Sequence, residues 1–320
     1  MGEQKLDYRK LIEFGKSSYV ISLPKTWLAQ QKLSKGDSVQ IDVEEDKLCI
    51  YPPTDSKPEK KKITLDITDL DLIQTKMLLI SRYIRNYGEI TIVAKDLPKR
   101  SKQVRNIIHD LLALEIVEET GEMIKTQDFL NMESIDLLDT IKKMELITRD
   151  MLKDSTNSFD ENMAESLEVR DKDVNRYYYL ASRLIRYLQR RPATAKANGF
   201  TQGELLRMWN LAVKIESIAD NSKRVSKMMR RLQLNGEEKK ELKKLYVNIS
   251  KYYEETVDAY FAKEQRKSII LRPKANKLTK DCKDYFRSNW DVDWVPTILE
   301  KLKSIVADIK SITATLCDMS

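Results

Sequence analysis

Hydrophobic positions recur every three or four residues from Met132 to the C-terminal end of the chain. This spacing places apolar side chains on one face of a helix and predicts a helical bundle. The clearest stripe alternates steps of three and four: Val295, Ile298, Leu302, Ile305, Ile309, Ile312 and Leu316. Two groups of three helices are predicted, a first unit at 131–233 and a second at 237–320, with helices at 132–156, 160–190, 201–233, 237–264, 275–287 and 294–317.

A different pattern precedes the bundle. Between residues 60 and 130, short β-branched runs alternate with helical periodicity, which predicts a small α/β module that connects the two ends of the chain. The expected helices are 69–86 and 99–114, and the expected strands are 63–67, 89–94, 115–119 and 123–128.

The first 53 residues predict a β-rich unit. Strands are expected at 9–14 and 19–23, followed by a short helix that begins after Pro24, and then by a strand pair at 38–43 and 47–51 joined by the acidic turn Glu44-Glu45-Asp46. So short a chain buries too little apolar surface to fold alone, so the unit is expected to dimerise. Residues 54–62 have the charged composition of a linker.

The order of these elements, with the segments "GKSSYVISLP", "SLPKTW" and "LSKGDSV", resembles the AbrB/SpoVT family of swapped-hairpin domains. The resemblance covers about the first fifty residues and implies an intertwined homodimer that binds duplex DNA. An unrelated hairpin subdomain is the alternative.

Charge is polarised within this unit. Residues 1–36 contain seven basic and three acidic side chains, whereas residues 37–51 contain one basic and five acidic ones. Only the basic part can approach phosphates, and it carries the predicted DNA-binding residues Arg9, Lys10, Lys16 and Lys25. The net charge of +7 over the whole chain permits nucleic-acid binding but does not prove it.

Bulk composition agrees with a mainly helical protein. The 320 residues include only eight glycines and eight prolines, with 33% charged residues. No apolar run is long enough to span a bilayer and the start is not a signal peptide, so a cytoplasmic protein without membrane insertion is expected. Three widely spaced cysteines suggest neither a disulfide framework nor a thiolate metal site.

Acidic side chains in the first three-helix unit are the candidate chemistry. Asp171 falls on the apolar seam of its helix with Asn175 one turn on, and Glu216 and Asp220 stack on the next helix. Carboxylates in such places need a cation, and oxygen ligands suit Mg²⁺, Mn²⁺, Ca²⁺ or Fe. The predicted metal ligands are therefore Asp171, Asn175, Glu216 and Asp220. An internal salt-bridge network, with Arg224 as a competing partner, is the alternative.

The segments "RDKDVNRYYYL" and "VKIESIADNSKRV" resemble the PhoU family, whose three-helix units carry acidic D/E-x-x-x-D/N motifs. Together with the N-terminal unit, the chain resembles archaeal PhoU-family phosphate uptake regulators. The resemblance implies a metal-binding regulator of phosphate homeostasis that dimerises. The second unit departs from the motif, because Ser304 stands where the acid before Asp308 is expected, so this unit is predicted to be degenerate.

Two basic clusters remain, 223–231 at the end of a helix and 99–105 at the start of another. The cluster at 223–231 is expected to form a solvated helix face. The cluster at 99–105 is more suggestive of an anionic partner, because the helix dipole does not favour cations at a helix start. The lone histidine, His109, accompanies no acidic motif, and no nucleotide loop or activated nucleophile is present. The protein is therefore not expected to be an enzyme, and a metal-dependent hydrolase is a rival hypothesis.

The sequence thus predicts a cytoplasmic, homodimeric transcription regulator that binds DNA and responds to phosphate. The main alternative is an adaptor that does not bind DNA and acts on a phosphate transporter or its signalling kinase.

Overall fold

A computed structural model describes residues 8–43, 46–53 and 61–318. The chain divides into two compact units, residues 1–59 and residues 60–320, and each is described by itself. The acidic turn at Glu44-Glu45 and most of the predicted linker lie outside the described residues.

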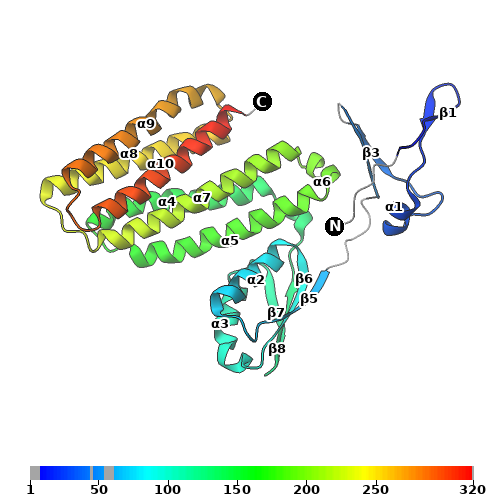
Figure 1. The fold of residues 1–320 in the computed structure, drawn as a ribbon, viewed down its shortest axis with the longest axis horizontal. Coiled ribbons are helices and arrows are strands. Elements are labelled where there is room, and N and C mark those ends of the chain that lie inside the picture. Colours follow the sequence, from blue (N-terminus) through cyan, green and yellow to red (C-terminus); the bar gives the residue numbers. More distant parts are fainter. Residues whose placement is uncertain (1–7, 44–45, 54–60, 319–320) are drawn as a thin grey trace. The chain divides into compact units, whose positions relative to one another are not determined.

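The first unit consists of two antiparallel hairpins and one short helix (Figure 1). Gly15 adopts φ +72° in the first turn, a left-handed conformation that glycine accepts without strain. Pro24 precedes the helix and ends the preceding extended segment. The elements are β1 (Ile12–Phe14), β2 (Ser18–Val20), α1 (Lys25–Gln30), β3 (Gln40–Val43) and β4 (Leu48–Tyr51).

Neither hairpin of the first unit buries its apolar face. In the second hairpin, Ile41 pairs with Ile50 and Val43 with Leu48, so one face of the two strands is entirely apolar. Val43 is nevertheless 72% exposed, and none of the described residues of this unit is buried. An isolated two-stranded hairpin is marginally stable at best in water, and the described residues of this unit supply no buried core for either hairpin.

The second unit begins with the α/β module. Its four-stranded sheet has the order β5-β6-β8-β7, in which β5 and β6 are parallel and the other neighbours are antiparallel. Leu79, Tyr83 and Ile108 from the two helices are buried with the strand residues Ile90 and Ile92 in a core of the module's own. The elements are β5 (Lys61–Asp66), α2 (Leu72–Ile84), β6 (Tyr87–Val93), α3 (Leu97–His109), β7 (Leu114–Glu119) and β8 (Met123–Asp128).

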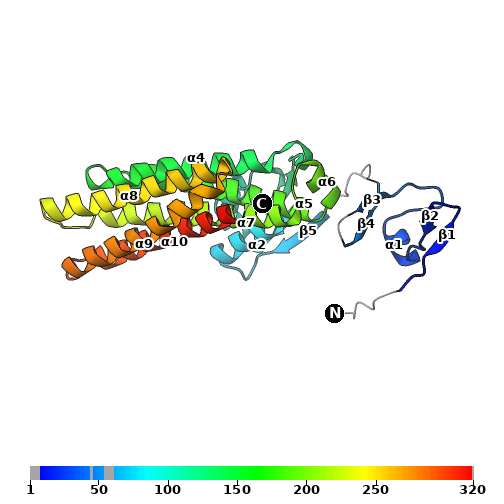
Figure 2. The same cartoon turned by 90° about the horizontal axis from the view of Figure 1, so that it is seen from above.

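The remainder of this unit is helical, which confirms the predicted fold class. Helices α4, α5 and α7 pack on one another, as do α8, α9 and α10, and contacts of α7 with α10 and of α4 with α8 join the two groups (Figures 1 and 2). One apolar core runs through both groups. The helices are α4 (Leu137–Ser155), α5 (Ala164–Gln189), α6 (Pro192–Ala197), α7 (Gln202–Met229), α8 (Gly236–Phe261), α9 (Gln265–Ser288) and α10 (Val295–Cys317), with 3-10 turns η1 (Met132–Ser134) and η2 (Thr156–Phe159).

Several helix boundaries differ from the prediction. Helix α9 begins ten residues earlier than the predicted start at 275 and contains Pro273. Proline removes the hydrogen bond to the carbonyl of Ile269, but both residues lie on the exposed face, where water can satisfy that carbonyl. Helix α4 begins only after Asp136, whose side chain accepts a hydrogen bond from the N–H of Asp139 and caps the helix.

Among the described residues, no helix combines the length and the apolar character that crossing a bilayer requires.

Candidate functional site

The acidic motifs of the first three-helix unit lie where α5 packs against α7 (Figure 1). Asp171 shares its side of α5 with Leu167 and Val174, so the packing of that apolar seam carries the carboxylate into the interface, where it is 7% exposed. Helix α7 carries the second motif and begins at a capping box. The side chain of Thr201 accepts a hydrogen bond from the N–H of Glu204, and the side chain of Glu204 accepts one from the N–H of Thr201, so the start of the helix is fixed.

A lysine lies between the two motifs. The ammonium Nζ of Lys223 on α7 is 2.7 Å from Oδ2 of Asp171 and 2.9 Å from Oδ1 of Asp220. Arg224 Nε also contacts Asp220, at 2.7 Å from Oδ2. Burial by itself would lower the pKa of Lys223. The hydrogen bonds and charges of Asp171 and Asp220 outweigh burial, so the pKa of Lys223 is raised. Lys223 is therefore a charged group that bridges the two helices.

The remaining two predicted ligands behave differently. Asn175 donates from Nδ2 to the backbone oxygen of Asp171 at 2.9 Å and to Oδ2 of the same residue at 3.3 Å. Glu216 is half-buried, and burial, followed by the nearby carboxylates of Asp220 and Asp171, raises its pKa to about 7. Glu216 is thus the member of the set whose charge is least compensated.

All four predicted ligands come from one interface, and their oxygens suit a hard cation. In the part of the chain that the structure describes, however, no group of three or more His, Cys, Asp and Glu side chains could hold a metal ion. The ammonium of Lys223 already neutralises Asp171 and Asp220, so a metal ion would have to displace it. The arrangement of these residues fits the ammonium of Lys223 better than a metal ion, and it agrees with the alternative of an internal salt-bridge network.

A second carboxylate is held in a similar way in the other three-helix unit. Asp308 on α10 is 9% exposed, receives Nζ of Lys214 at 2.9 Å, and accepts a hydrogen bond from Oγ of Ser217 at 2.7 Å. Ser304 donates instead to the backbone oxygen of Glu300. Asp308 is therefore bound to α7 through Lys214 and Ser217.

The predicted DNA-binding residues are all exposed. Lys16 lies in the turn between β1 and β2, whereas Arg9 and Lys10 precede β1 and so lie at the other end of that hairpin. Lys25 is the first residue of α1. Within this unit, cations are therefore presented at both ends of the first hairpin and at the start of the helix.

Several cations of the two basic clusters, 99–105 and 223–231, contact other residues of this chain. Arg100 donates to the backbone oxygens of Ile67 and Leu70 and thus ties α3 to the segment before α2. Arg105 pairs with Glu119 at 2.8 Å. In the other cluster, Lys223 and Arg224 bind Asp220, and Lys227 pairs with Glu168 at 2.8 Å. Of these contacts, the sequence indicated only Arg224 as a partner in a salt-bridge network, one helical turn beyond Asp220.

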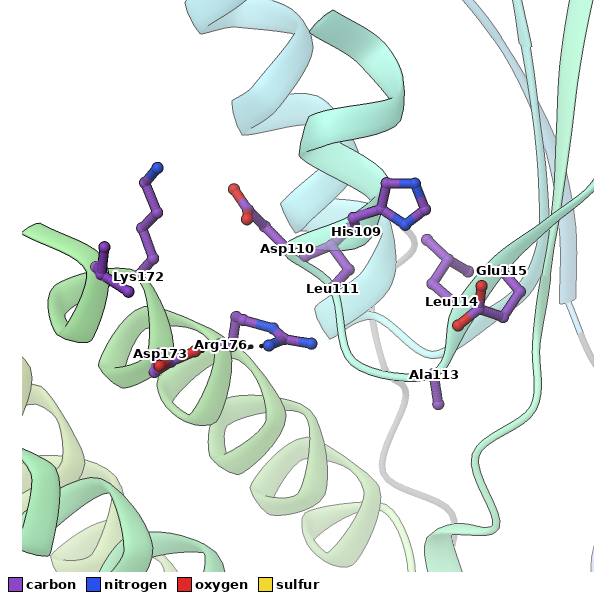
Figure 3. A pocket seen from close by; sticks show the side chains of 10 residues that line it. His109, Asp110, Leu111, Ala113, Leu114, Glu115, Lys172, Asp173 and Arg176 are labelled. Carbon is purple, nitrogen blue, oxygen red and sulfur yellow. Dashed lines mark ion pairs between the residues drawn. The ribbon is translucent and has the colours of Figure 1, made fainter. Parts of the chain in front are cut away.

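A cleft of about 450 Å³ lies between the end of α3, the start of β7 and one side of α5 (Figure 3). Its charged lining has both signs, with Lys172 and Arg176 opposite Asp110 and Glu115, and Arg176 Nη1 is 3.5 Å from Oδ1 of Asp173. His109, which had no predicted role, also lines the cleft. A lining of mixed charge does not select an anion such as phosphate.

Comparisons with known families match two parts of the chain. Residues 14–58 match the model for MazE, a bacterial antitoxin that recognises its toxin, and residues 141–229 match the model of the PhoU domain. No curated protein and no solved structure gives a significant match. The chain therefore carries an N-terminal domain of the MazE/AbrB type and a PhoU domain. The PhoU match ends with α7, so the second three-helix unit lies outside it.

Proposed function

We propose that this protein is a homodimeric, DNA-binding regulator of phosphate homeostasis, in which the MazE/AbrB-type unit binds duplex DNA and the PhoU domain relays phosphate status. The observation that carries the proposal is that the N-terminal unit exposes both an apolar hairpin face and several cations. A second copy of the unit would cover the apolar face and place two sets of cations on one assembly.

The paired strands supply the first step of the argument. Ile41, Val43 and Leu48 are each more than half exposed on a face that alternation would bury. Covering such residues is favourable by about 25 cal/mol per Å² of apolar surface, and a second copy offers the same face. Dimerisation therefore supplies the core that this unit lacks.

The cations supply the second step. Lys10, Lys16 and Lys25 are exposed, and the unit contains few acidic residues before Asp37. Contacts between cations and phosphates release counterions, so DNA affinity should fall steeply as salt rises. Two copies double the number of phosphates that can be bound at once.

The PhoU domain supplies the regulatory half of the proposal. The ion pair of Lys223 with Asp171 couples α7 to α5, and Asp220 on α7 shares the same ammonium, so a change at these charges would alter how the two helices pack. Metal binding by Asp171, Asn175, Glu216 and Asp220 stays a prediction, because a metal ion has to compete with Lys223.

The test is DNA binding by the full chain, measured by fluorescence anisotropy on short duplexes of several sequences over a series of salt concentrations. The variant Lys10→Gln/Lys16→Gln should bind all duplexes more weakly, and its salt slope should be lower by about 0.9 for each phosphate that it no longer neutralises. The control Lys240→Gln/Lys251→Gln removes the same charge from α8 and should behave as wild type.

The adaptor alternative gives a different result. An adaptor whose N-terminal unit only dimerises would remain dimeric by analytical ultracentrifugation and show no binding to any duplex at low salt. That outcome would replace the DNA-binding proposal.

A further inference from the structure

Helix α9 presents one long face to solvent. Its inner side, with Leu271, Ala275, Leu278 and Cys282, is buried against the bundle, where α9 contacts α8 and α10. Figures 1 and 2 both show α9, in orange, at the outer edge of the helical bundle. The opposite side extends over about 36 Å, at 1.5 Å per residue for a helix of 24 residues.

The exposed face of α9 is strongly basic. Side chains three or four residues apart gather on it, and six of them are cations: Arg266, Arg272, Lys277, Lys280, Lys283 and Arg287. Among the described residues of α9, Asp284 is the one fully exposed acid and pairs with Arg287 at 3.1 Å, and Asp281, one turn before it, is half-buried. Among the residues that the structure describes, the other five cations make no ion pair. Their charge is therefore available to an external anionic surface.

The same face carries large apolar side chains. Ile269 is 71% exposed and Ile270 is 68% exposed, and Pro273 is exposed beside them. A single exposed isoleucine needs no explanation, but an adjacent pair of isoleucines on a basic helix face is the pattern of an amphipathic surface-binding helix. These side chains contribute nothing to the core of the bundle.

We propose that the outer face of α9 binds the surface of a membrane that contains anionic phospholipids. The cations would lie at the headgroups, and Ile269 and Ile270 would insert at the boundary with the acyl chains. Duplex DNA would engage the cations but leave both isoleucines in water. A lipid surface uses both features, and its extent and fluidity suit flexible cations spread along the whole helix. The proposal does not depend on the DNA-binding function, since α9 lies outside both family matches.

The test uses the full chain and sedimentation with two kinds of vesicle, phosphatidylcholine alone and phosphatidylcholine mixed with phosphatidylglycerol. Wild-type protein should bind only the anionic vesicles, and high salt should weaken the binding. The variant Lys277→Gln/Lys280→Gln/Lys283→Gln should lower the partition coefficient about a hundredfold, and Ile269→Ser/Ile270→Ser about tenfold.

Matched controls separate this face from general charge and hydrophobicity. The variant Lys240→Gln/Lys244→Gln/Lys251→Gln removes three cations from α8, and Ile73→Ser/Met77→Ser removes two exposed apolar side chains from α2. Both should bind anionic vesicles as wild type does. All substituted side chains are exposed, so circular dichroism should show unchanged helicity for every variant.

Three results would overturn the proposal. The first is no binding of wild type to anionic vesicles. The second is an equal decrease in the α9 variants and their controls. The third is an unchanged partition of the isoleucine variant, which would leave only adsorption by charge. Weaker DNA binding by the α9 lysine variant, with vesicle binding unaffected, would assign this face to nucleic acid instead.

Discussion

Arg183 on α5 and Asp128 at the end of β8 form a buried, two-pronged ion pair, with Nη1 3.0 Å from Oδ1 and Nη2 2.5 Å from Oδ2. The side chains are 2% and 5% exposed. Arg183 Nε also donates to Oδ1 of Asn86, and the guanidinium lies 4.5 Å from the ring centre of Tyr83. The pair fastens the α/β module to the first three-helix unit.

Breaking the pair of Arg183 and Asp128 should strongly destabilise the compact unit of residues 60–320. Arg183→Ala leaves the buried carboxylate of Asp128 without its arginine, so we expect a decrease of about 3–5 kcal/mol in the free energy of unfolding. Urea unfolding followed by circular dichroism measures the change. The control Arg105→Ala removes a more exposed partner of Glu119 and should cost less than about 1 kcal/mol.

The double variant Arg183→Met/Asp128→Leu completes this experiment. Replacing both charges leaves no buried ion of this pair behind, so stability should recover at least in part relative to Arg183→Ala. Equal destabilisation by Arg183→Ala and Arg105→Ala would mean that the buried pair does not hold the module to the bundle.

Removing the internal cation should favour a metal ion. In Lys223→Met, Asp171 is deprived of its lysine and Asp220 keeps only Arg224, so the carboxylates should bind Mn²⁺ more tightly than in wild type. Calorimetric titration with Mn²⁺ measures the difference. The triple variant Lys223→Met/Glu216→Ala/Asp220→Ala is the control and should abolish the increase in affinity. Equal affinity in wild type and Lys223→Met would show that Lys223 does not compete with a metal ion.

Glu145 on α4 should make stability depend on pH. Burial is the main cause that raises the pKa of this carboxyl, against the lowering effect of Arg149. The folded protein therefore holds a proton at Glu145 in a pH range where the unfolded chain has released it. This contribution to stability is present at low pH and is lost as pH rises from the unfolded pKa, near 4.5, through the raised folded value.

The variant Glu145→Gln tests this pH dependence. Glutamine keeps the oxygen that accepts from Arg149 Nε but cannot ionise. Its melting temperature should rise relative to wild type as pH increases through that range, with little difference in acid. The control Glu237→Gln changes an exposed carboxylate and should follow the wild-type curve. A constant offset between Glu145→Gln and wild type at every pH would contradict the assignment.

The exposed face of the second hairpin should be the core of a dimer. In a single copy Val43 is 72% exposed, so Val43→Asp should change monomer stability by no more than about 0.5 kcal/mol. Buried between two copies, the same aspartate should raise the dimer dissociation constant more than about tenfold. Analytical ultracentrifugation measures this constant, and Val117→Asp on β7 is the control. An unchanged constant for Val43→Asp would exclude this face from the interface.

Periodicity was sufficient to predict the bundle, because each helix buries one stripe of apolar residues, as in α10. It was not sufficient for α9, whose start lies before Pro273, since tertiary packing of Ser268 and Leu271 holds the helix together across the proline. Local patterns thus locate long elements well and their ends poorly.

The candidate site was predictable only in part. The position of Asp171 on an apolar seam required a cation, but the partner, Lys223, lies 52 residues away in the chain and was assigned to a solvated face. Arg183 was missed for the same reason, because Asp128 is 55 residues distant. Sequence identifies a buried charge that needs compensation, whereas only the packed structure identifies what compensates it.

Lys214 and Lys223 are nine residues apart on α7, and at about 100° per residue they project from opposite sides of the helix. One binds Asp308 on α10 and the other binds Asp171 on α5. A fragment cut after Met229, where the PhoU match ends, would keep α7 but strip one side of it, exposing apolar residues to water and leaving Lys214 without its carboxylate. For expression of a stable fragment, the boundary set by sequence similarity is therefore the wrong place to cut, and the chain should be kept through Cys317.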